Sequence, residues 1–509
     1  MSTARTWAVA LTGVDGHLVE VEADLSNQTP EFRIIGLPDK SLAEAVQRVH
    51  NACKNAGLDL PRRRLTVNLS PASLPKHGAG FDLGIAVAAL AAGGSIEPRS
   101  IAATVHVGEL GLDGRIRPVP GVLPAVFAAA RAGFERVIVP HANEAEARLV
   151  TGIDVRAAAS LAEVAVWHGA DVETPEVEAV DMASPVVEEP SVLDLSDVVG
   201  QDEAIEALIV AAAGGHHMLL SGPPGAGKTM LARRLPGIMP PLAEQEALEV
   251  ASIRSLSGDL IPALDRTPPL EAPHHSASVA ALIGGGSRTA RPGAIARAHC
   301  GVLFLDEAAE FSRVALDALR QPLESGVIEV HRAGFTARFP AKFRLLLAMN
   351  PCPCGNHGVR GSECVCPPMA IRRYSTRLSG PLRDRIDIDL HVARVASSYA
   401  TDDRGVRTTT SQARARVLAA SERAAQRWEG APWQRNADVP GTWLRQGAQR
   451  LSPATRSPLD RALERGALTL RGYDRVLRVA WTMADLGGID RPGSDEIGRA
   501  LHLRRGLSG

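Results

Sequence analysis

The 509-residue sequence lacks several features that would place it in a specialised class of protein. Its net charge is only −1, so the chain is not a polycation and any surface for nucleic acid must be local. The N-terminus has no basic start followed by an apolar segment, which argues against a secretory signal. The longest weakly polar run, Leu83 to Ile96, is too short to span a bilayer. We therefore expect a cytoplasmic protein without membrane contact and with reduced cysteines.

The length and one acidic segment predict how the chain is divided. A chain of this size is too long for one hydrophobic core. Residues 171–190 contain seven acidic residues, three prolines and no basic residue, a composition typical of a linker. We expect an N-terminal domain over residues 1–170 and a larger part after the linker. From Ser411 onward the pattern is helical. The residues expected in the core of this helical part are Trp443, Leu463 and Leu477.

The spacing of apolar residues predicts two different folds before and after the linker. In the N-terminal part, the expected strands are residues 6–10, 19–23, 64–69, 105–110 and 136–139. The expected helices are residues 42–56, 83–92 and 122–132, which gives a mixed α+β domain. After the linker, the expected strands are residues 217–221, 302–305 and 345–349. These strands alternate with helices, which predicts an α/β core with a mostly parallel sheet and a ligand at the carboxyl ends of the strands.

One motif points directly to a nucleotide. Residues 222–229 read Gly-Pro-Pro-Gly-Ala-Gly-Lys-Thr and match the P-loop pattern at every position, between an expected strand and an expected helix. The glycines let backbone N–H groups approach phosphate, and the helix N-terminus adds a favourable dipole. Lys228 is expected to contact the β- and γ-phosphates, and Thr229 to bind Mg²⁺. The residues assigned to ATP and Mg²⁺ are Gly222, Pro223, Pro224, Gly225, Ala226, Gly227, Lys228, Thr229 and Asp306.

Two further strands end in polar residues that would complete a site for ATP hydrolysis. The apolar residues 302–305 are followed by Asp306 and Glu307. Asp306 is placed to join the Mg²⁺ shell, and Glu307 to polarise the attacking water. The strand at 345–349 is followed by Asn350, which we interpret as orienting the same water. An asparagine before a proline is also a common turn residue, which is the alternative role.

With these residues in place, the sequence resembles the ComM/YifB family of magnesium-chelatase-like AAA+ ATPases over nearly the whole chain. The strings that carry the resemblance are Ala272-Pro-His-His275, Leu282-Ile-Gly-Gly-Gly286, Arg291-Pro-Gly293, Gly301-Val-Leu-Phe-Leu-Asp-Glu307, Asn350-Pro-Cys-Pro-Cys-Gly355 and Leu378-Ser-Gly-Pro-Leu382. The family usually continues with Leu-Pro-Glu-Phe after the acidic pair, where this sequence has Ala-Ala-Glu-Phe at 308–311. The resemblance implies an AAA+ core over residues 191–400 with a cysteine-rich insertion at 352–366, and a C-terminal helical lid over 401–509.

The resemblance also implies a homo-hexameric ring with ATP at the subunit boundaries, closed by a heterologous interface. Each site would then take an arginine from its neighbour. Arg385 matches this finger position best, with Arg377 and Arg383 as alternatives. In the helical region, Arg471 is the first choice for the sensor-2 contact with the γ-phosphate and Arg475 the second. A solvent-exposed helix face stays the alternative for each of them.

Family members of the ComM type are implicated in DNA branch migration during natural transformation, which implies a motor that threads DNA through the ring. Residues 327–339 alternate on either side of Ala333-Gly334 and predict a β-hairpin. In related ATPases such a hairpin points into the pore, where Arg332 would contact phosphate and Phe335 would stack on a base. An ordinary hairpin packed on its own domain is the alternative. Residues 401–509 hold 19 Arg, no Lys and 12 acidic residues, which fits either phosphate binding or solvated helix faces.

Two N-terminal strings resemble the catalytic domain of Lon protease and imply its fold, of the ribosomal protein S5 domain 2 type. They are residues 75–82 and residues 108–115, the second continuing with residues 117–121 and 132–140. A Lon-type protease needs a serine activated by a lysine, but the corresponding positions hold Gly80 and Leu123. We therefore expect no peptidase activity here, and a DNA-binding or assembly role instead. The basic residues 62–64 would be a phosphate contact or a solvated turn.

Four of the six cysteines form two C-x-C pairs that suggest a metal site. A set of four thiolates suits Zn²⁺ in a closed structural site. The spacing is tighter than the usual C-x₂-C, so His357 is an alternative ligand, and reduced thiols that close a loop are the alternative to zinc. The paired cysteines are Cys352, Cys354, Cys364 and Cys366. The isolated ones, expected to be small core residues, are Cys53 and Cys300.

These features predict an ATP-driven DNA helicase or translocase that remodels branched DNA in recombination or natural transformation. One alternative is a chelatase motor for metal insertion into a tetrapyrrole; the Lon-like domain and the cysteines count against it. A second is a protein remodeller or protease, and the missing Ser–Lys pair opposes the protease. A third is a scaffold that only binds nucleotide, which has no need of Glu307.

Overall fold

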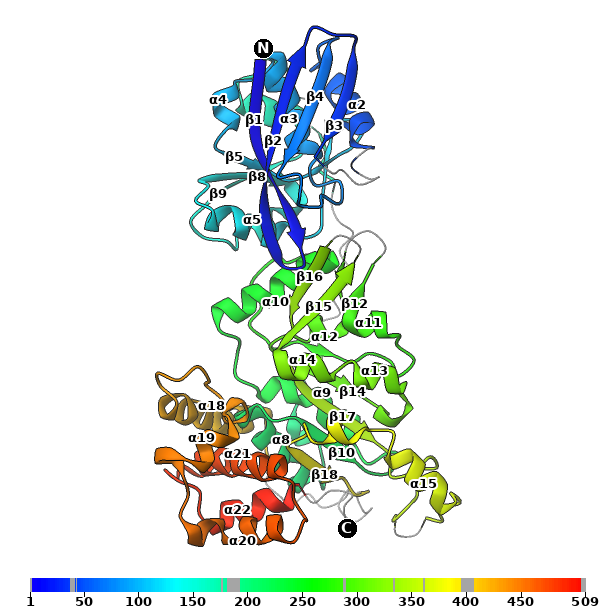
Figure 1. Ribbon diagram of the computed structural model, residues 1–509, viewed down its shortest axis with the longest axis vertical. Helices are drawn as coiled ribbons and strands as arrows, with labels where there is room; N and C mark the ends of the chain where they lie inside the picture. Colours follow the sequence, from blue (N-terminus) through cyan, green and yellow to red (C-terminus); the bar gives the residue numbers. More distant parts are fainter. Residues whose placement is uncertain are drawn as a thin grey trace.

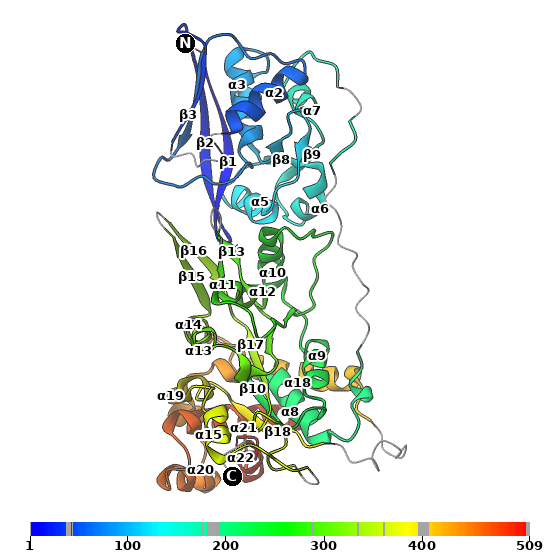
Figure 2. The same cartoon turned by 90° about the vertical axis from the view of Figure 1, so that its right-hand side faces the viewer.

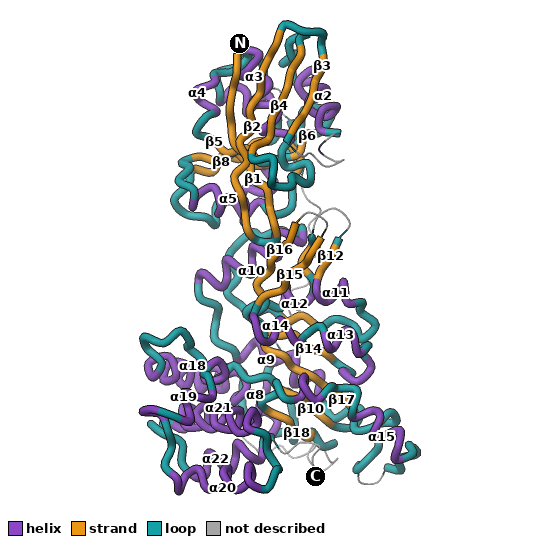
Figure 3. The backbone as a smooth tube through the Cα atoms, in the orientation of Figure 1, coloured by secondary structure: helices purple, strands orange, loops and turns teal. Residues whose placement is uncertain are grey.

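The computed structural model describes residues 2–36, 42, 44–174, 177–180, 193–286, 290–332, 335–359, 362–394 and 407–504, with the backbone alone for Ser2, Arg332 and Phe335. The molecule has three regions, of which the first lies at one end of the long axis and the third lies beside the part of the second that is farthest from it (Figure 1). They are an N-terminal region with a mixed sheet, a core with a parallel sheet and a C-terminal helical region (Figure 3). Most of the expected linker 171–190 lies outside the described residues.

The N-terminal region is built on a seven-stranded sheet in the order β3-β4-β2-β1-β5-β8-β9. Its strands are β1 (Ser2–Thr12), β2 (Asp15–Ser26), β3 (Glu31–Ile35), β4 (Arg64–Ser70), β5 (Thr104–His106), β8 (Arg136–Pro140) and β9 (Asp154–Ala158). The pairs β1–β2 and β2–β4 are antiparallel and the others parallel. In β2 the buried residues Val19, Val21 and Ala23 alternate with more exposed ones, because alternate side chains face the helices.

The helices of this region pack on both faces of that sheet, one group beside Ala8 and Val21 and another beside Val9 and Leu18. They are α2 (Ala45–Asn55), α3 (Asp82–Gly93), α4 (Pro98–Ile101), α5 (Val122–Arg131), α6 (Glu144–Ala147) and α7 (Leu161–Trp167). Helix α3 is buried along almost its entire length, as its uninterrupted apolar sequence predicts. The expected helices at 42–56, 83–92 and 122–132 therefore form, the first of them from Ala45.

One expected strand is interrupted. Residues 105–110 were expected to be continuous, but β5 ends at His106 and β6 (Glu109–Leu110) pairs with β7 (Ile116–Arg117) instead. The backbone of Gly108 turns to the start of α3, since its N–H donates to Gly80 O at 3.0 Å and its carbonyl accepts from the Leu83 N–H at 3.1 Å. The apolar pattern of the segment does not show this change of partner.

The core contains a five-stranded, entirely parallel sheet in the order β11-β14-β17-β10-β18. Its strands are β10 (Met218–Ser221), β11 (Leu270–Glu271), β14 (Val302–Leu305), β17 (Arg344–Met349) and β18 (Ile388–His391). The three strands expected from the sequence are thus confirmed, and they lie side by side. Because all strands run in the same direction, the residues that follow β10, β14 and β17 meet at one edge of the sheet.

Helices surround this sheet. They are α8 (Asp202–Gly214), α9 (Lys228–Ile238), α10 (Glu244–Ser257), α11 (Val279–Ile283), α12 (Ala294–Arg297), α13 (Arg313–Asp317), α14 (Arg320–Ser325), α15 (Pro368–Ser375) and α16 (Gly380–Arg383). Two hairpins extend from the core toward the N-terminal region (Figures 1 and 2). One consists of β12 (Gly284–Gly285) and β13 (Arg291–Pro292). The other, expected from the sequence, consists of β15 (Val327–Arg332) and β16 (Phe335–Pro340).

Among the described residues, the N-terminal region contacts the core through the turn between β1 and β2 and through α5. The turn between β1 and β2 reaches β16, where the Val14 N–H donates to Arg338 O at 3.4 Å. A side chain on Gly13 would collide with the backbone of Arg338, so this close approach requires glycine. Helix α5 packs on α10, and the Gly121 N–H donates to Ser255 O at 3.0 Å. The β15–β16 hairpin is therefore in contact with the N-terminal region along one flank.

The C-terminal region is helical, as expected. Its helices are α18 (Thr410–Arg427), α19 (Gly441–Arg445), α20 (Pro453–Glu464), α21 (Leu470–Gly487) and α22 (Ser494–His502). They share one apolar core with α8 and α9, in which Trp481 and Leu477 are fully buried. Trp443 is 52% exposed and contacts Trp433 edge to face, so its expected place in the core is wrong. Among the described residues, no helix is both long and apolar enough to cross a membrane.

Candidate nucleotide site

The P-loop connects β10 to α9 and is open on the side where a phosphate chain would lie. Gly225 and Gly227 have φ values of 77° and 88°, which favour glycine, and a Cβ on either would meet no atom within 4 Å. The Nζ of the buried Lys228 donates to Gly222 O at 2.6 Å, to Pro223 O at 2.9 Å and to the side chain of Asn350 at 3.1 Å. Burial lowers the pKa of Lys228.

Strand β14, which β17 separates from β10 in the sheet, brings the two acids to the loop. The Thr229 hydroxyl donates to Asp306 Oδ2 at 2.6 Å, and the N–H of Glu307 donates to Asp306 Oδ1 at 2.9 Å. Hydroxyl and carboxylate oxygens are ligands that Mg²⁺ prefers. Together with the open P-loop, these oxygen ligands fit a nucleoside triphosphate with its Mg²⁺. The structure thus gathers Lys228, Thr229, Asp306, Glu307 and Asn350 at one edge of the sheet.

Two residues of this site were missed in the sequence. Gln201 holds the P-loop, since its side-chain amide donates to Ala226 O at 3.1 Å and to Ala393 O at 2.7 Å. His275 lies with Nδ1 3.1 Å from Glu307 Oε2. His275 belongs to the string Ala272-Pro-His-His275, but its place beside Glu307 could not be predicted. The strand that precedes this string, β11, has only two residues and therefore shows no alternation of apolar and polar residues.

The four paired cysteines, which follow Asn350 in the sequence, form one cluster. Their Sγ atoms are all within 4.8 Å of one another, and the separations that involve Cys352, Cys354 and Cys364 are 3.4 to 3.7 Å. Thiolates about 2.3 Å from a tetrahedral Zn²⁺ lie about 3.8 Å apart, so the cluster fits zinc. His357 contributes its backbone N–H to Cys352 Sγ at 3.4 Å and is not part of the ligand group. The other two cysteines, Cys53 and Cys300, are buried as expected.

The cluster also touches the P-loop. A Cβ on Gly355, whose φ is 79°, would collide with the ring of Pro224. Gly355 of the cysteine-rich loop therefore packs against Pro224 of the P-loop.

The candidate arginines differ in their hydrogen-bond and ion-pair partners. Arg385 forms an ion pair with Glu324 and donates to Pro381 O at 2.6 Å. Arg377 donates to Ala309 O at 2.6 Å, in the segment that follows Glu307 of the same chain. The third candidate, Arg383, lies 3.5 Å from Asp389. Arg471 is exposed, and no hydrogen bond or ion pair is found for it among the described residues.

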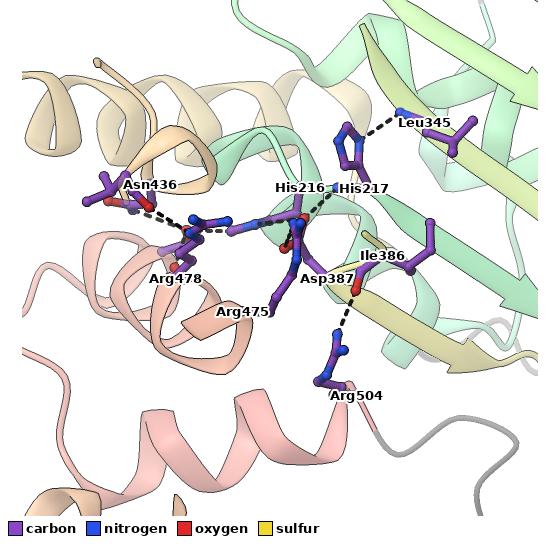
Figure 4. A network of polar contacts seen from close by, with 11 residues as sticks. His216, His217, Leu345, Ile386, Asp387, Asn436, Arg475, Arg478 and Arg504 are labelled. Atoms are coloured by element: carbon purple, nitrogen blue, oxygen red, sulfur yellow. Dashed lines mark hydrogen bonds and ion pairs between the residues drawn. The ribbon is translucent and has the colours of Figure 1, made fainter. Parts of the chain in front are cut away.

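Arg475 is part of a buried network that joins the helical region to the core (Figure 4). Its Nη1 donates to Asp387 Oδ1 at 2.7 Å, and the Asp387 side chain has no exposed surface. The His217 N–H donates to the other carboxylate oxygen at 2.9 Å, and Arg504 donates to Ile386 O at 2.6 Å. Burial alone would raise the pKa of Asp387, but Arg475 and His216 outweigh it and hold that pKa well below its ordinary value.

Arg385, Arg471 and Arg475 lie at the opposite edge of the sheet from the P-loop. The N–H groups of Asp387 and Ile388 donate to His217 O, directly before β10, whereas the P-loop follows the end of β10. A four-residue strand separates these positions by about 13 Å. A cleft of about 210 Å³ at this edge is lined by Leu323, Glu324, Asp384, Arg385, Arg471, Asp474, Arg475 and Arg478.

Family models for the ChlI subunit of magnesium chelatase match most of the chain. The model described as magnesium chelatase, subunit ChlI, matches residues 194–400, and the one for its C-terminal part matches residues 407–504. A third, described as subunit ChlI of Mg-chelatase, matches residues 21–143.

Relatives of the same length extend this result. The protein Rv2897c of Mycobacterium tuberculosis is 48% identical over 511 residues, 99% of each chain. Competence protein ComM of Haemophilus influenzae is 40% identical over 514 residues, which cover 99% of this chain and 98% of ComM. YifB of Escherichia coli is 38% identical over 509 residues, 100% of this chain and 97% of YifB. The chain belongs to the ComM/YifB family.

Membership of this family makes the chain a magnesium-chelatase-like AAA-type ATPase, which agrees with the donor set at the P-loop. A weaker similarity links its N-terminal part to Lon protease of Mycolicibacterium smegmatis, 28% identical over 172 residues that cover 31% of this chain and 21% of the protease. Gly80 and Leu123 are the residues expected from the sequence at the positions of the protease serine and lysine. Leu123 is buried, and a Cβ on Gly80 would meet no atom within 4 Å.

The expected DNA contacts are only partly described. Arg332 and Phe335 pair with each other at the end of the β15–β16 hairpin, but their side chains lie outside the described part. Of the basic residues 62–64, Arg62 and Arg63 are exposed, and Arg64 pairs with Glu31 at 3.4 Å.

We expect Arg475→Ala to destabilise the helical region by about 3–5 kcal/mol, because it leaves the buried carboxylate of Asp387 without its cation. Arg471→Ala, one turn earlier on the same helix, removes an exposed side chain and should change stability by less than about 0.5 kcal/mol. Urea unfolding followed by tryptophan fluorescence measures both, since four of the six tryptophans lie beyond residue 427. Equal stability of the two variants would contradict the assignment of Arg475 to a structural role.

Proposed function

We propose that the protein is an ATP-driven DNA motor that works as a homo-hexameric ring and promotes branch migration in recombination or natural transformation. The position of two arginines relative to the P-loop is the observation that supports a ring. Arg385 and Arg471 lie at the sheet edge opposite their own P-loop, so they can serve a nucleotide only when it is bound to a neighbouring subunit. A head-to-tail interface that closes into a ring provides such a neighbour.

In each such site, the chain's residues divide the work. Lys228 and the P-loop amides bind the phosphates, and Thr229 and Asp306 hold Mg²⁺, which neutralises developing charge when it is bound. Glu307 accepts a proton from the attacking water, which Asn350 helps to orient. Arg385 from the adjacent subunit stabilises the charge on the transferred phosphoryl group, and Arg471 is the better candidate for a second contact because Arg475 is engaged with Asp387.

Support for DNA as the substrate comes from two directions. The name of the ComM relative links that protein to competence, and the relative covers nearly the whole chain. The β15–β16 hairpin carries Arg332 and Phe335 at its end, residue types that suit phosphate contact and base stacking.

A chelatase motor is the second candidate, because the family models that match the chain are those of the magnesium chelatase ChlI subunit. Such a motor would drive metal insertion into a tetrapyrrole through a partner subunit. DNA should not change the ATP turnover of such a motor. One assay of turnover with and without DNA therefore distinguishes the two candidates.

Steady-state ATP turnover with and without forked DNA, at low and moderate salt, tests the proposal. We expect several-fold stimulation that decreases with salt, because phosphate contacts release counterions. Glu307→Gln serves as the control for contaminating ATPases. Turnover that no DNA changes would remove the DNA motor and favour the chelatase reading.

We also propose that the four clustered cysteines bind one structural Zn²⁺ per chain. Cys354→Ser combined with Cys364→Ser should abolish zinc in the purified protein, as measured by elemental analysis. Since Gly355 supports Pro224 of the P-loop, nucleotide affinity should fall as well. Cys53→Ser, outside the cluster, should keep both properties. Zinc content that does not change in the double variant would contradict this site.

A further inference from the structure

The helical region and the core of one chain share a single apolar cluster. Buried residues of α8, α9, β10 and β18 belong to the same cluster as buried residues of α18 to α22. Leu220 and Leu390 come from the sheet, and Leu477 and Trp481 come from α21. Two parts of a chain are expected to move relative to each other unless the interface between them is large and hydrophobic. The continuous apolar cluster therefore argues against movement between these two parts.

The end of the helical region also binds the last strand of the parallel sheet. Strand β18 is at the end of the sheet and has β10 as its neighbour. The N–H of Asp389 in this strand donates to Leu503 O at 2.7 Å, and Arg504 donates to Ile386 O at 2.6 Å. Backbone groups at the edge of a sheet need partners. Here residues directly after α22 provide them, so the helical region and the sheet are joined by backbone bonds as well as by apolar packing.

A buried carboxylate connects two strands of the sheet to helix α21 (Figure 4). Asp387, directly before β18, accepts from Arg475 of α21 at 2.7 Å and from the N–H of His217, directly before β10, at 2.9 Å. A second contact lies further along the same helix, where His216 Nε2 is 2.8 Å from Thr482 Oγ1. Helix α21 is therefore attached to the sheet at two points, about two turns apart.

The ion pair of Asp387 also connects the two arginines that are assigned to the neighbouring nucleotide. Arg385 lies two residues before Asp387 in the core, and Arg471 lies one turn before Arg475 on α21. Arg385, Arg471 and Arg475 line the same cleft of about 210 Å³. Residues four apart on a helix lie on the same face. The bond between Asp387 and Arg475 thus fixes the segment of Arg385 relative to the helix turn of Arg471.

We propose that Asp387 is a positioning residue that holds the core and the helical region of one chain as a single rigid unit, which presents Arg385 and Arg471 together to the nucleotide of the neighbouring subunit. This inference rests on the proposed ring. Positive groups that are already in place stabilise charge in the transition state without reorganisation at that moment. The movements of the ATP cycle then take place between subunits, and the angle between the core and the helical region of one chain stays constant.

Asp387→Asn in the full-length chain tests the positioning role, because the amide keeps the size of the side chain but loses the charge that pairs with Arg475. We expect the turnover number for ATP to fall by up to about 10²-fold, the cost of misplacing a catalytic group by about 1 Å. Equilibrium binding of a fluorescent ATP analogue should be retained, because the P-loop of the variant is unchanged. Turnover equal to that of the wild type would overturn the role of Asp387.

Mixed rings show which edge of the subunit is defective. Lys228→Ala lacks the phosphate contact but keeps its arginines, so mixing it with Asp387→Asn should restore turnover. Mixing Arg385→Ala with Asp387→Asn should not, because both variants are defective at the same edge. Recovery in both mixtures, or in neither, would overturn the assignment of Asp387 to the arginine edge. The mixture of Lys228→Ala with Arg385→Ala is the control, and the proposed ring itself is rejected if that mixture stays inactive.

A covalent link tests the rigid unit independently of the ring and of how well Asp387→Asn folds. His502 Nε2 of α22 lies 2.8 Å from Glu203 Oε1 of α8, and both side chains are more than half exposed. Glu203→Cys combined with His502→Cys, joined by a short bifunctional thiol reagent, fixes the helical region to the core. We expect ATP turnover, with and without forked DNA, to equal that of the unlinked double variant.

The wild type treated with the same reagent controls for reaction at the native cysteines, and each single variant controls for attachment at one end. A large loss of turnover that appears only in the linked double variant would show that the helical region has to move relative to the core, and would overturn the rigid unit. The proposed function would survive that result if DNA still stimulates the unlinked protein.

Discussion

Replacing Arg385 by alanine is expected to reduce ATP turnover about 10³–10⁵-fold, the contribution of an arginine finger in related reactions. The guanidinium neutralises charge that develops on the phosphoryl oxygens in the transition state. Arg385 lies at the edge of the sheet opposite its own P-loop and is held there by Glu324. Phosphate release measures the loss, and ATP binding by the variant should be retained because its P-loop is intact.

A mixing experiment separates action between subunits from action within one. Lys228→Ala removes the phosphate contact but keeps Arg385, so each variant alone should be inactive. In mixed rings, some interfaces combine the intact P-loop of one variant with the intact arginine of the other, and activity should reappear. Mixtures that stay inactive would contradict action in trans. Normal turnover of Arg385→Ala with a large loss in Arg377→Ala would assign the finger to Arg377 instead.

The parts of the site that the sequence predicts correctly are those that follow local rules. The P-loop lies between a strand and a helix, and Asp306 and Asn350 each follow an apolar strand. In a parallel sheet the carboxyl ends of the strands share one edge, so these residues meet without any knowledge of distant contacts. The β15–β16 hairpin and the group of C-x-C cysteines are also local features. Their members are close in the chain, so the sequence alone indicates that they lie together.

Contacts between distant residues could not be predicted in this way. Arg475 and Asp387 are 88 positions apart, and nothing in either segment shows that the carboxylate is buried and needs a cation. The sequence therefore ranked Arg471 before Arg475 without showing that Arg475 is engaged by the buried Asp387. Gly108 changes partner for a similar reason, because its bonds go to the start of α3. The roles of the individual arginines stay predictions until turnover is measured.

Glu307→Gln is expected to reduce ATP turnover about 10²–10⁴-fold, since the amide is nearly the same size but cannot accept the proton of the water. ATP binding should remain, because Lys228, Thr229 and Asp306 are unchanged. Phosphate release and equilibrium binding of a fluorescent ATP analogue measure the two properties separately. Turnover near that of the wild type would mean that another group activates the water.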